Sequence, residues 1–333
     1  MALAAVSVAP GSSRAVSQQV LEYIHDVFDF GSLQSLKLRH YHGWQDLIIL
    51  ICKGAEPLKL RSLEIQWSFK DNLTKPYESI SALLDKIQGL EELFLYTTAA
   101  EYSLGPWRAL LRHRTSLRRF VHHQRSLDLR DDDYLFGKVC DTPEPIFMSP
   151  EDEDDSPGGS LGKLNLTCLG IACIPEFMGS FVSGLASKSS LQVLHMRQSG
   201  GDLIRYYLGW DKPLERDVEL FDFFGIDLPV ERFPMVGDAF IDFAQWVFGP
   251  TGIRSLRLLA YGDFSYEGRF GQSTLLLCRR DPSCGTEYSA GEEASQVLRF
   301  REVKKGEDAE LWGLFEREKH VLTACPCDTI FHV

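Results

Sequence analysis

A short spacing of apolar residues recurs along the chain and limits the folds that it can adopt. An apolar residue is followed by two others, a second apolar residue, one other and a third apolar position. Most successive copies start between 25 and 30 residues apart. The copies are Leu33/Leu36/Leu38, Leu60/Leu63/Ile65, Leu90/Leu93/Leu95, Leu117/Phe120/His122, Leu166/Leu169/Ile171, Leu191/Leu194/Met196 and Ile253/Leu256/Leu258. This spacing is typical of leucine-rich repeats, in which one unit cannot bury its apolar face alone and must stack on its neighbours.

The segments between these copies carry apolar residues three and four positions apart, which predicts helices. The predicted helices are 44–53, 79–88, 107–114, 176–188, 238–248 and 308–324. Pro76, Pro106 and Pro175 lie near the starts of three of them, where the missing N–H of proline costs a helix least. A strand and a helix in each period predict an α/β fold, namely an irregular leucine-rich-repeat solenoid (horseshoe) with parallel inner strands and outer helices.

Two stretches interrupt the repeats and define the predicted organisation of the chain. Residues 131–155 hold ten acidic residues and one basic residue, and this block cannot bury enough apolar surface to order itself. Residues 206–224 interleave aromatic and acidic residues. We predict a disordered N-terminus at 1–15, the first repeats at 16–130, an acidic disordered insertion at 131–162, and the remaining repeats at 163–333 with an irregular insertion at about 199–235.

Charge and cysteine content exclude several classes of protein. The net charge of −12 argues against a nucleic-acid binder, and no apolar run approaches the length that crosses a membrane. Three of the eight cysteines sit in apolar runs, which favours reduced core cysteines and a cytoplasmic or nuclear location. A secreted repeat protein is the alternative, and disulfides with occupied sequons at Asn72 and Asn165 would distinguish it.

No nucleophile elbow, phosphate-binding loop or zinc-protease motif occurs, so we expect no catalytic residue, metal or cofactor, and predict that the chain is not an enzyme. The strand residues that alternate with the buried leucines are expected to line the concave face of the solenoid. Arginine and aromatic residues there are typical interface anchors. The predicted partner-binding residues are Arg39, Gln66, Phe94, Tyr96, His123, His195, Arg197 and Arg257. The alternative is an ordinary solvated inner surface.

The predicted function is therefore non-enzymatic protein–protein interaction through the concave face, with a protein partner of unknown identity. Replacing Phe94 and Tyr96 by alanine is then expected to weaken partner capture without unfolding the chain. The alternative is an enzyme or small-molecule binder with a pocket between residues 206–224 and the solenoid. In the acidic insertion, Thr142, Ser149 and Ser156 each precede a proline and are possible phosphorylation sites, although the insertion can equally be a passive linker.

Several segments resemble a group of fungal F-box/leucine-rich-repeat-like proteins, and the resemblance runs from about residue 30 to the end. The segments are 110–121, 164–175 (LNLTCLGIACIP), 190–200 (SLQVLHMRQSG), 246–252 (WVFGPTG) and 260–264 (AYGDF). The resemblance implies repeats that grip a substrate for a Skp1–cullin ubiquitin ligase, which an N-terminal F-box joins. Because the first repeat starts by Leu33, we expect a Skp1–cullin partner only if the sequence given lacks an F-box of the whole protein.

Overall fold

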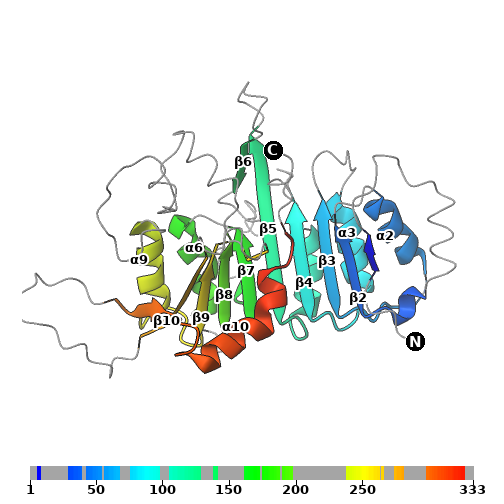
Figure 1. Ribbon diagram of the computed structural model, residues 1–333. Helices are drawn as coiled ribbons and strands as arrows, with labels where there is room; N and C mark the ends of the chain where they lie inside the picture. Colours follow the sequence, from blue (N-terminus) through cyan, green and yellow to red (C-terminus); the bar gives the residue numbers. More distant parts are fainter. Residues whose placement is uncertain are drawn as a thin grey trace, which may run out of the picture.

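The computed structural model describes the chain in several ranges, which together form one mixed sheet with helices on both of its faces (Figure 1). The described residues are 6–8, 29–39, 43–54, 56–67, 76–97, 105–128, 138–141, 161–172, 175–187, 190–197, 238–262, 264–265, 274–280 and 298–326. The strand order is β1-β2-β3-β4-β5-β7-β8-β9-β10-β11, and β6 pairs with β5 outside this path. The predicted α/β class is confirmed in this form, as a mostly parallel sheet with helices.

The strands from β1 to β9 that follow the main path are parallel, which requires a crossover between each pair. Their bounds are β1 Val6–Val8, β2 Ser35–Arg39, β3 Ser62–Trp67, β4 Glu92–Thr97, β5 Arg119–Asp128, β7 Cys168–Ala172, β8 Val193–Arg197 and β9 Leu258–Tyr261. Two antiparallel strands, β10 (Leu275–Arg279) and β11 (Phe300–Glu302), extend the sheet beyond β9. The antiparallel extension is not predicted by the repeat pattern.

Helices of the crossovers pack on one side of the sheet, which we call the first face (Figure 1). They are α2 (Trp44–Lys53), α3 (Pro76–Lys86), α4 (Gly105–Leu110), α6 (Pro175–Val182) and α9 (Asp238–Val247), and the 3-10 turns η3 (Leu111–His113) and η4 (Ser183–Leu185) continue α4 and α6. A further 3-10 turn, η1 (Phe30–Ser32), precedes β2. The predicted crossover helices are confirmed because their apolar stripes, such as Trp44, Leu47, Ile48 and Ile51 in α2, are buried in one core.

The repeated apolar slots form two continuous rows under these helices. The register aligns Leu36, Leu63, Leu93, Phe120, Leu169, Leu194 and Leu259 in one row, and Leu38, Ile65, Leu95, His122, Ile171, Met196 and Tyr261 in the other. All of them are buried. The predicted frame of the last copy is wrong by three residues. Leu259 and Tyr261 fill its slots, whereas Leu258 points to the opposite face.

Two predicted disordered segments contain strands. β1 lies within residues 1–15, and β6 (Lys138–Asp141) lies within residues 131–162. β6 pairs antiparallel with the far end of β5, at Arg125–Asp128, where β5 extends past its neighbours and offers unpaired backbone groups. The rest of the acidic insertion, from 142 to 160, and the irregular insertion at about 199–235 lie outside the described residues.

The last helix lies on the other side of the sheet, which we call the α10 face. α10 (Ala309–Leu322) crosses the lower ends of the central strands, and the chain then climbs toward β4 (Figure 1). Asp308, just before the helix, is paired with Arg301 of β11 and accepts a hydrogen bond from the backbone N–H of Lys304 (3.0 Å). The Arg301 guanidinium lowers the pKa of Asp308 to about 2. This pairing fixes where α10 starts relative to the end of the sheet.

Candidate functional site

The strand residues predicted to line an inner surface do share one face of the sheet, the α10 face. The register places Lys37, Glu64, Phe94, Val121, Gly170, His195 and Ala260 in one row, and Arg39, Gln66, Tyr96 and His123 in the next. Most of these side chains are buried, including Gln66, Phe94, Tyr96, His123, His195 and Arg197. Arg39 is half-buried. The chain therefore covers with its own residues most of the surface predicted for a partner.

An apolar cluster joins α10 to the central strands. Leu314, Phe315, Val321 and Leu322 pack with Phe94, Tyr96, Val121, Val193, Leu258 and Ala260. Strands that are apolar on both sides are typical of sheets covered on both faces, as β4 (ELFLYT) and β7 (CLGIA) are here. Burial of four large apolar side chains of α10 contributes on the order of 6–12 kcal/mol before the entropic cost of ordering them. The helix is thus an integral layer of the fold.

Beyond the helix, a buried carboxylate on β3 holds the chain. Glu64 is fully buried and accepts two hydrogen bonds from Arg39, at 2.7 and 2.9 Å, with Lys37 Nζ at 3.6 Å. Gln66 Nε2 donates to its Oε1 at 2.9 Å, and the backbone N–H of Cys325 donates to the same oxygen at 3.0 Å. Burial alone raises the pKa of Glu64, but the hydrogen bonds and charges of Arg39 and Lys37 outweigh it and leave this pKa below its usual range.

Arg197 of β8 binds the other end of the peptide group whose N–H belongs to Cys325. Its guanidinium donates to the backbone carbonyl of Ala324 and to the Ser265 hydroxyl. The Ala324 carbonyl and the Cys325 N–H belong to one peptide group, so Arg197 and Glu64 bind its two polar ends. We call these two side chains the peptide clamp. They come from strands that are separated in the sheet by β4, β5 and β7.

Cys325 is held in an unusual backbone conformation inside this clamp. Its φ is 52°, the only positive value among the described residues other than glycine. Side chains with a Cβ disfavour this left-handed region, and such strain persists only where the surroundings impose it. The residue is fully buried, and burial raises the pKa of its thiol well above the usual range. The clamp and the apolar cluster supply the interactions that hold it there.

A second set of polar contacts anchors the C-terminal half of α10. Arg119 of β5 donates to Glu318 at 2.6 and 3.3 Å, and His320 lies 3.0 Å from Glu92 of β4. Burial tends to raise the pKa of Glu318, but the hydrogen bond and charge of Arg119 lower it overall. The His320 ring also meets the edge of Phe94, with ring centroids 6.4 Å apart. Charge pairs therefore set the position of α10 along the strands.

Of the predicted site residues, Arg39, Gln66 and Arg197 are brought together around the clamped peptide. Tyr96 and His123 contact each other edge to face, 5.1 Å between ring centroids. His195 Nε2 lies 2.8 Å from the carbonyl of Gly262, and its ring meets Phe264. The predicted partner role of these residues stays a prediction, because their side chains face the protein's own C-terminal segment.

Arg257 does not belong to this set. The wrong frame of the last copy placed it on a strand, but it precedes β9 and its guanidinium pairs with Glu310 of α10 at 2.6 Å, where both side chains are exposed. Glu64 lies on the predicted face but is not among the predicted partner-binding residues, and Glu318 and the clamped peptide group are absent from the prediction. The pairing partners lie up to 261 residues apart, and no local pattern could have joined them.

The described ranges contain no group of three or more metal-ligating side chains. Burial raises the pKa of the Cys168 and Cys325 thiols far above neutrality, so neither forms a thiolate nucleophile. The predicted phosphorylation sites Thr142, Ser149 and Ser156, and the alternative pocket at 206–224, lie outside the described residues.

Comparison with models of protein families, with curated proteins and with solved structures found no match for this chain. None of the helices in the described ranges is long and apolar enough to cross a membrane. The fold and the clamp together define an α/β protein with a mostly parallel sheet, one face of which binds a polypeptide segment of the same chain.

Proposed function

We propose that this chain is a non-enzymatic protein-binding module of the leucine-rich-repeat type, and that it binds a segment of its partner through the α10 face. The recurrent spacing and the parallel register of the strands support the solenoid part of this proposal. The polar side chains at the β2–β3 end of this face support the binding part. Lys37 and Arg39 there keep about a third of their side-chain surface exposed.

The peptide clamp is the observation that carries the proposal. Glu64 and Arg197 bind an N–H and a carbonyl, which every polypeptide possesses, rather than a particular side chain. Hydrogen bonds to charged groups contribute about 1.5–3 kcal/mol each, roughly twice as much as neutral ones. A partner segment can thus take the same bonds in place of the peptide group between Ala324 and Cys325.

For a partner segment to bind in this way, only the turn after α10 has to leave the clamp. The helix itself is fixed by its apolar cluster and by the pair of Arg119 with Glu318. The turn is held by the clamp and by the burial of Ala324 and Cys325 in the apolar cluster, and it contains the strained backbone of Cys325. Leaving the clamp relieves this strain, which offsets part of the lost hydrogen bonding. The α10 helix then forms one wall of the binding site.

Peptide selection can test this proposal without knowledge of the natural partner. A random peptide library is screened against the full chain and against a chain that ends at Thr323, which keeps α10 and removes the clamped peptide. We expect selected peptides to bind the shortened chain about tenfold more tightly, because the intramolecular competitor is gone. Arg197→Ala should abolish this binding, and Arg257→Ala, outside the clamp, should not affect it. Equal binding to all four proteins would contradict the proposal.

A role in substrate recognition for a ubiquitin ligase is the finer form of the proposal, and it rests on the resemblance to F-box proteins. Purification of the full chain from its own cells, followed by mass spectrometry, tests it. Recovery of Skp1 and cullin supports the role, with the other recovered proteins as candidate substrates. A different stable partner without them would contradict the ubiquitin role and leave the binding module intact.

A further inference from the structure

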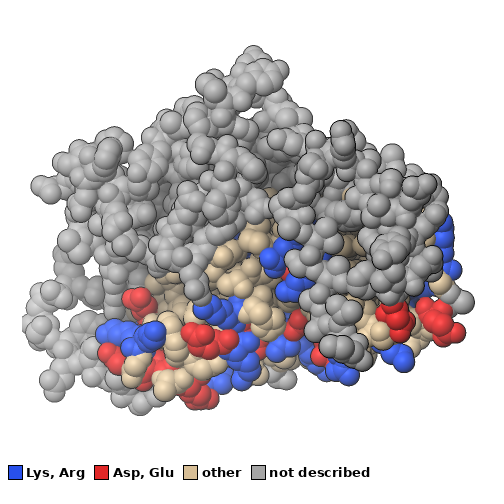
Figure 2. Space-filling view, turned by 45° about the vertical axis from the view of Figure 1, so that its right-hand side comes forward, with Lys and Arg blue, Asp and Glu red and all other residues tan. Residues whose placement is uncertain are grey.

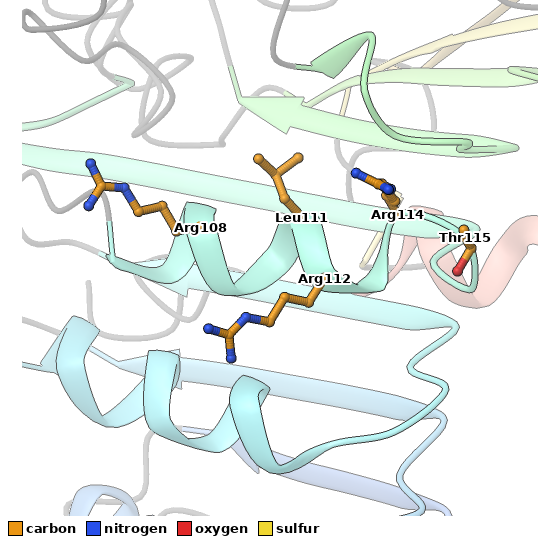
Figure 3. A pocket seen from close by; sticks show the side chains of 5 residues that line it. All are labelled: Arg108, Leu111, Arg112, Arg114 and Thr115. Carbon is orange, nitrogen blue, oxygen red and sulfur yellow. The ribbon is translucent and has the colours of Figure 1, made fainter.

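A groove on the first face, far from the clamp, is lined by basic residues of α4, η3 and the turn that follows. Figure 3 shows its lining residues, Arg108, Leu111, Arg112, Arg114 and Thr115. Arg112 points toward α3, where it pairs with Asp85 at 2.5 Å. Leu111 and Arg114 project from the opposite flank of the helix. That flank looks toward β7, since α3 occupies the other side.

Two of the arginines have no oppositely charged partner among the described residues. Arg108 and Arg114 are exposed, and neither side chain has a hydrogen bond or an ion pair with any other described residue. Arg112 is the internal comparison, because Asp85 compensates it. Leu111 between them is a partly buried apolar residue that packs against the core. An acidic segment with an adjacent apolar residue would match this surface in charge and in hydrophobicity.

The chain itself supplies such a segment at this place. The connection from β6 to β7 leaves the described residues after Asp141 and returns at Leu161. Leu161 and Leu164 are buried in the same core as Leu110 and Leu117, so the return is on the first face. Arg118, which follows η3 and its turn, donates to the backbone carbonyl of Asn165 at 3.0 Å, which brings the returning chain close to this turn. Residues 142–160 between these points contain six acidic residues and no basic one, and they include the apolar run 146–148.

We propose that the groove of Arg108, Leu111 and Arg114 is the docking site of the chain's own acidic segment, residues 142–160. Both ends of the segment are tethered to the fold, and a short tether gives an effective concentration in the millimolar range. Weak contacts therefore suffice, such as exposed arginine–carboxylate pairs. Phosphate on Ser149 or Ser156 would add negative charge and strengthen the docking. This site is independent of the peptide clamp and of the proposed function.

The test uses a synthetic fluorescent peptide of residues 142–160 and full-length chains. In the first chain the acidic residues of the segment are neutralised. The substitutions are Glu144→Gln, Glu151→Gln, Asp152→Asn, Glu153→Gln, Asp154→Asn and Asp155→Asn. We expect this chain to bind the peptide about tenfold more tightly than the wild type does, because its own segment no longer fills the groove. The difference should shrink as ionic strength rises.

The arginines are tested by adding Arg108→Glu and Arg114→Glu to the neutralised chain, which should remove the binding. The matched control adds Lys59→Glu and Arg254→Glu, two exposed residues on other parts of the protein, and should bind as before. Thermal unfolding followed by circular dichroism confirms that each chain is folded. Equal binding by the neutralised and wild-type chains, or binding that survives the arginine substitutions, would overturn the proposal. A peptide that binds none of the chains would also overturn it. If the groove instead serves an acidic segment of another protein, the peptide should bind equally to every chain that keeps Arg108 and Arg114.

Discussion

The two faces of the sheet are closed by different means. On the first face, β2, β3, β4, β7 and β8 are each followed by a helix, and apolar residues at a fixed spacing, mostly leucines, fill the layer between strands and helices. On the α10 face, a single helix near the end of the chain covers strands whose contact residues precede it by as many as 228 positions, and charge pairs fix its position. The first face is a sum of local units, whereas the second depends on one contact between distant parts of the chain.

The largest effect that we predict is a loss of stability, equal in size, when a buried aromatic side chain is removed from either face. Phe94 on the α10 face and Phe120 on the first face are each about 1% exposed. We expect Phe94→Ala and Phe120→Ala each to lower the free energy of unfolding by about 3–5 kcal/mol, because each leaves a cavity among packed neighbours. Urea unfolding followed by circular dichroism measures both.

This expectation corrects the sequence-based one, in which loss of Phe94 and Tyr96 weakens partner capture without unfolding the chain. Both side chains are part of the cluster under α10, and their removal acts first on stability. A cost below about 1 kcal/mol for Phe94→Ala, beside a full cost for Phe120→Ala, would show that α10 leaves the sheet in solution.

The first face could be predicted from the sequence because each of its units is local. A strand slot and the helix that covers it lie within one period, so spacing alone places Leu36, Leu63 and Leu93 in one row. Prediction from the spacing of apolar residues fails where leucines follow one another closely. Between Ile253 and Leu259 the pattern fits two frames, and only the pairing with β8 selects the frame with Leu259 in the slot.

The α10 face could be predicted only in part. Alternation correctly assigns Phe94, Tyr96 and His195 to one side of the sheet. It does not say what covers that side, because an inward-facing aromatic has the same spacing whether it meets solvent, a partner or a distant helix. The apolar character of both sides of β4 and β7 is the local sign that a second layer exists. The clamp has no local sign at all.

Acidic pH should lower the stability of the protein through one buried position of the first face. His122 occupies a position that is apolar in the other repeats, and burial lowers its pKa to about 4. Between pH 6.5 and pH 4 the unfolded chain takes up a proton there and the folded chain does not, so stability falls as the pH falls. The expected loss is about 3 kcal/mol across this window.

Replacing this residue by leucine should flatten the pH dependence of unfolding between pH 6.5 and 5. That range lies above the usual pKa of carboxylates, so Glu64, Glu92 and Glu318, with lowered pKa values, contribute only at lower pH. Burial also lowers the pKa of His113, which leaves a smaller residual slope. An unchanged slope in His122→Leu would mean that this slot is hydrated in the folded state.

The smallest predicted effect is the loss of stability when the ion pair of α10 with the sheet is removed. It distinguishes the contribution of this ion pair from that of the apolar cluster. Glu318→Ala removes a buried carboxylate and leaves the half-buried Arg119 without its main partner, which should cost about 2 kcal/mol. Arg317→Ala removes a neighbour of the same carboxylate that is largely exposed, and should cost about 0.5 kcal/mol or less. Urea unfolding of the two variants gives the comparison. If both substitutions cost the same, the apolar cluster alone positions the helix. The alternative result is that Glu318→Ala costs far more than Arg317→Ala, and that adding Arg119→Ala to Glu318→Ala costs little more. The ion pair then sets the register of α10 on the sheet, and this register places Ala324 and Cys325 in the clamp.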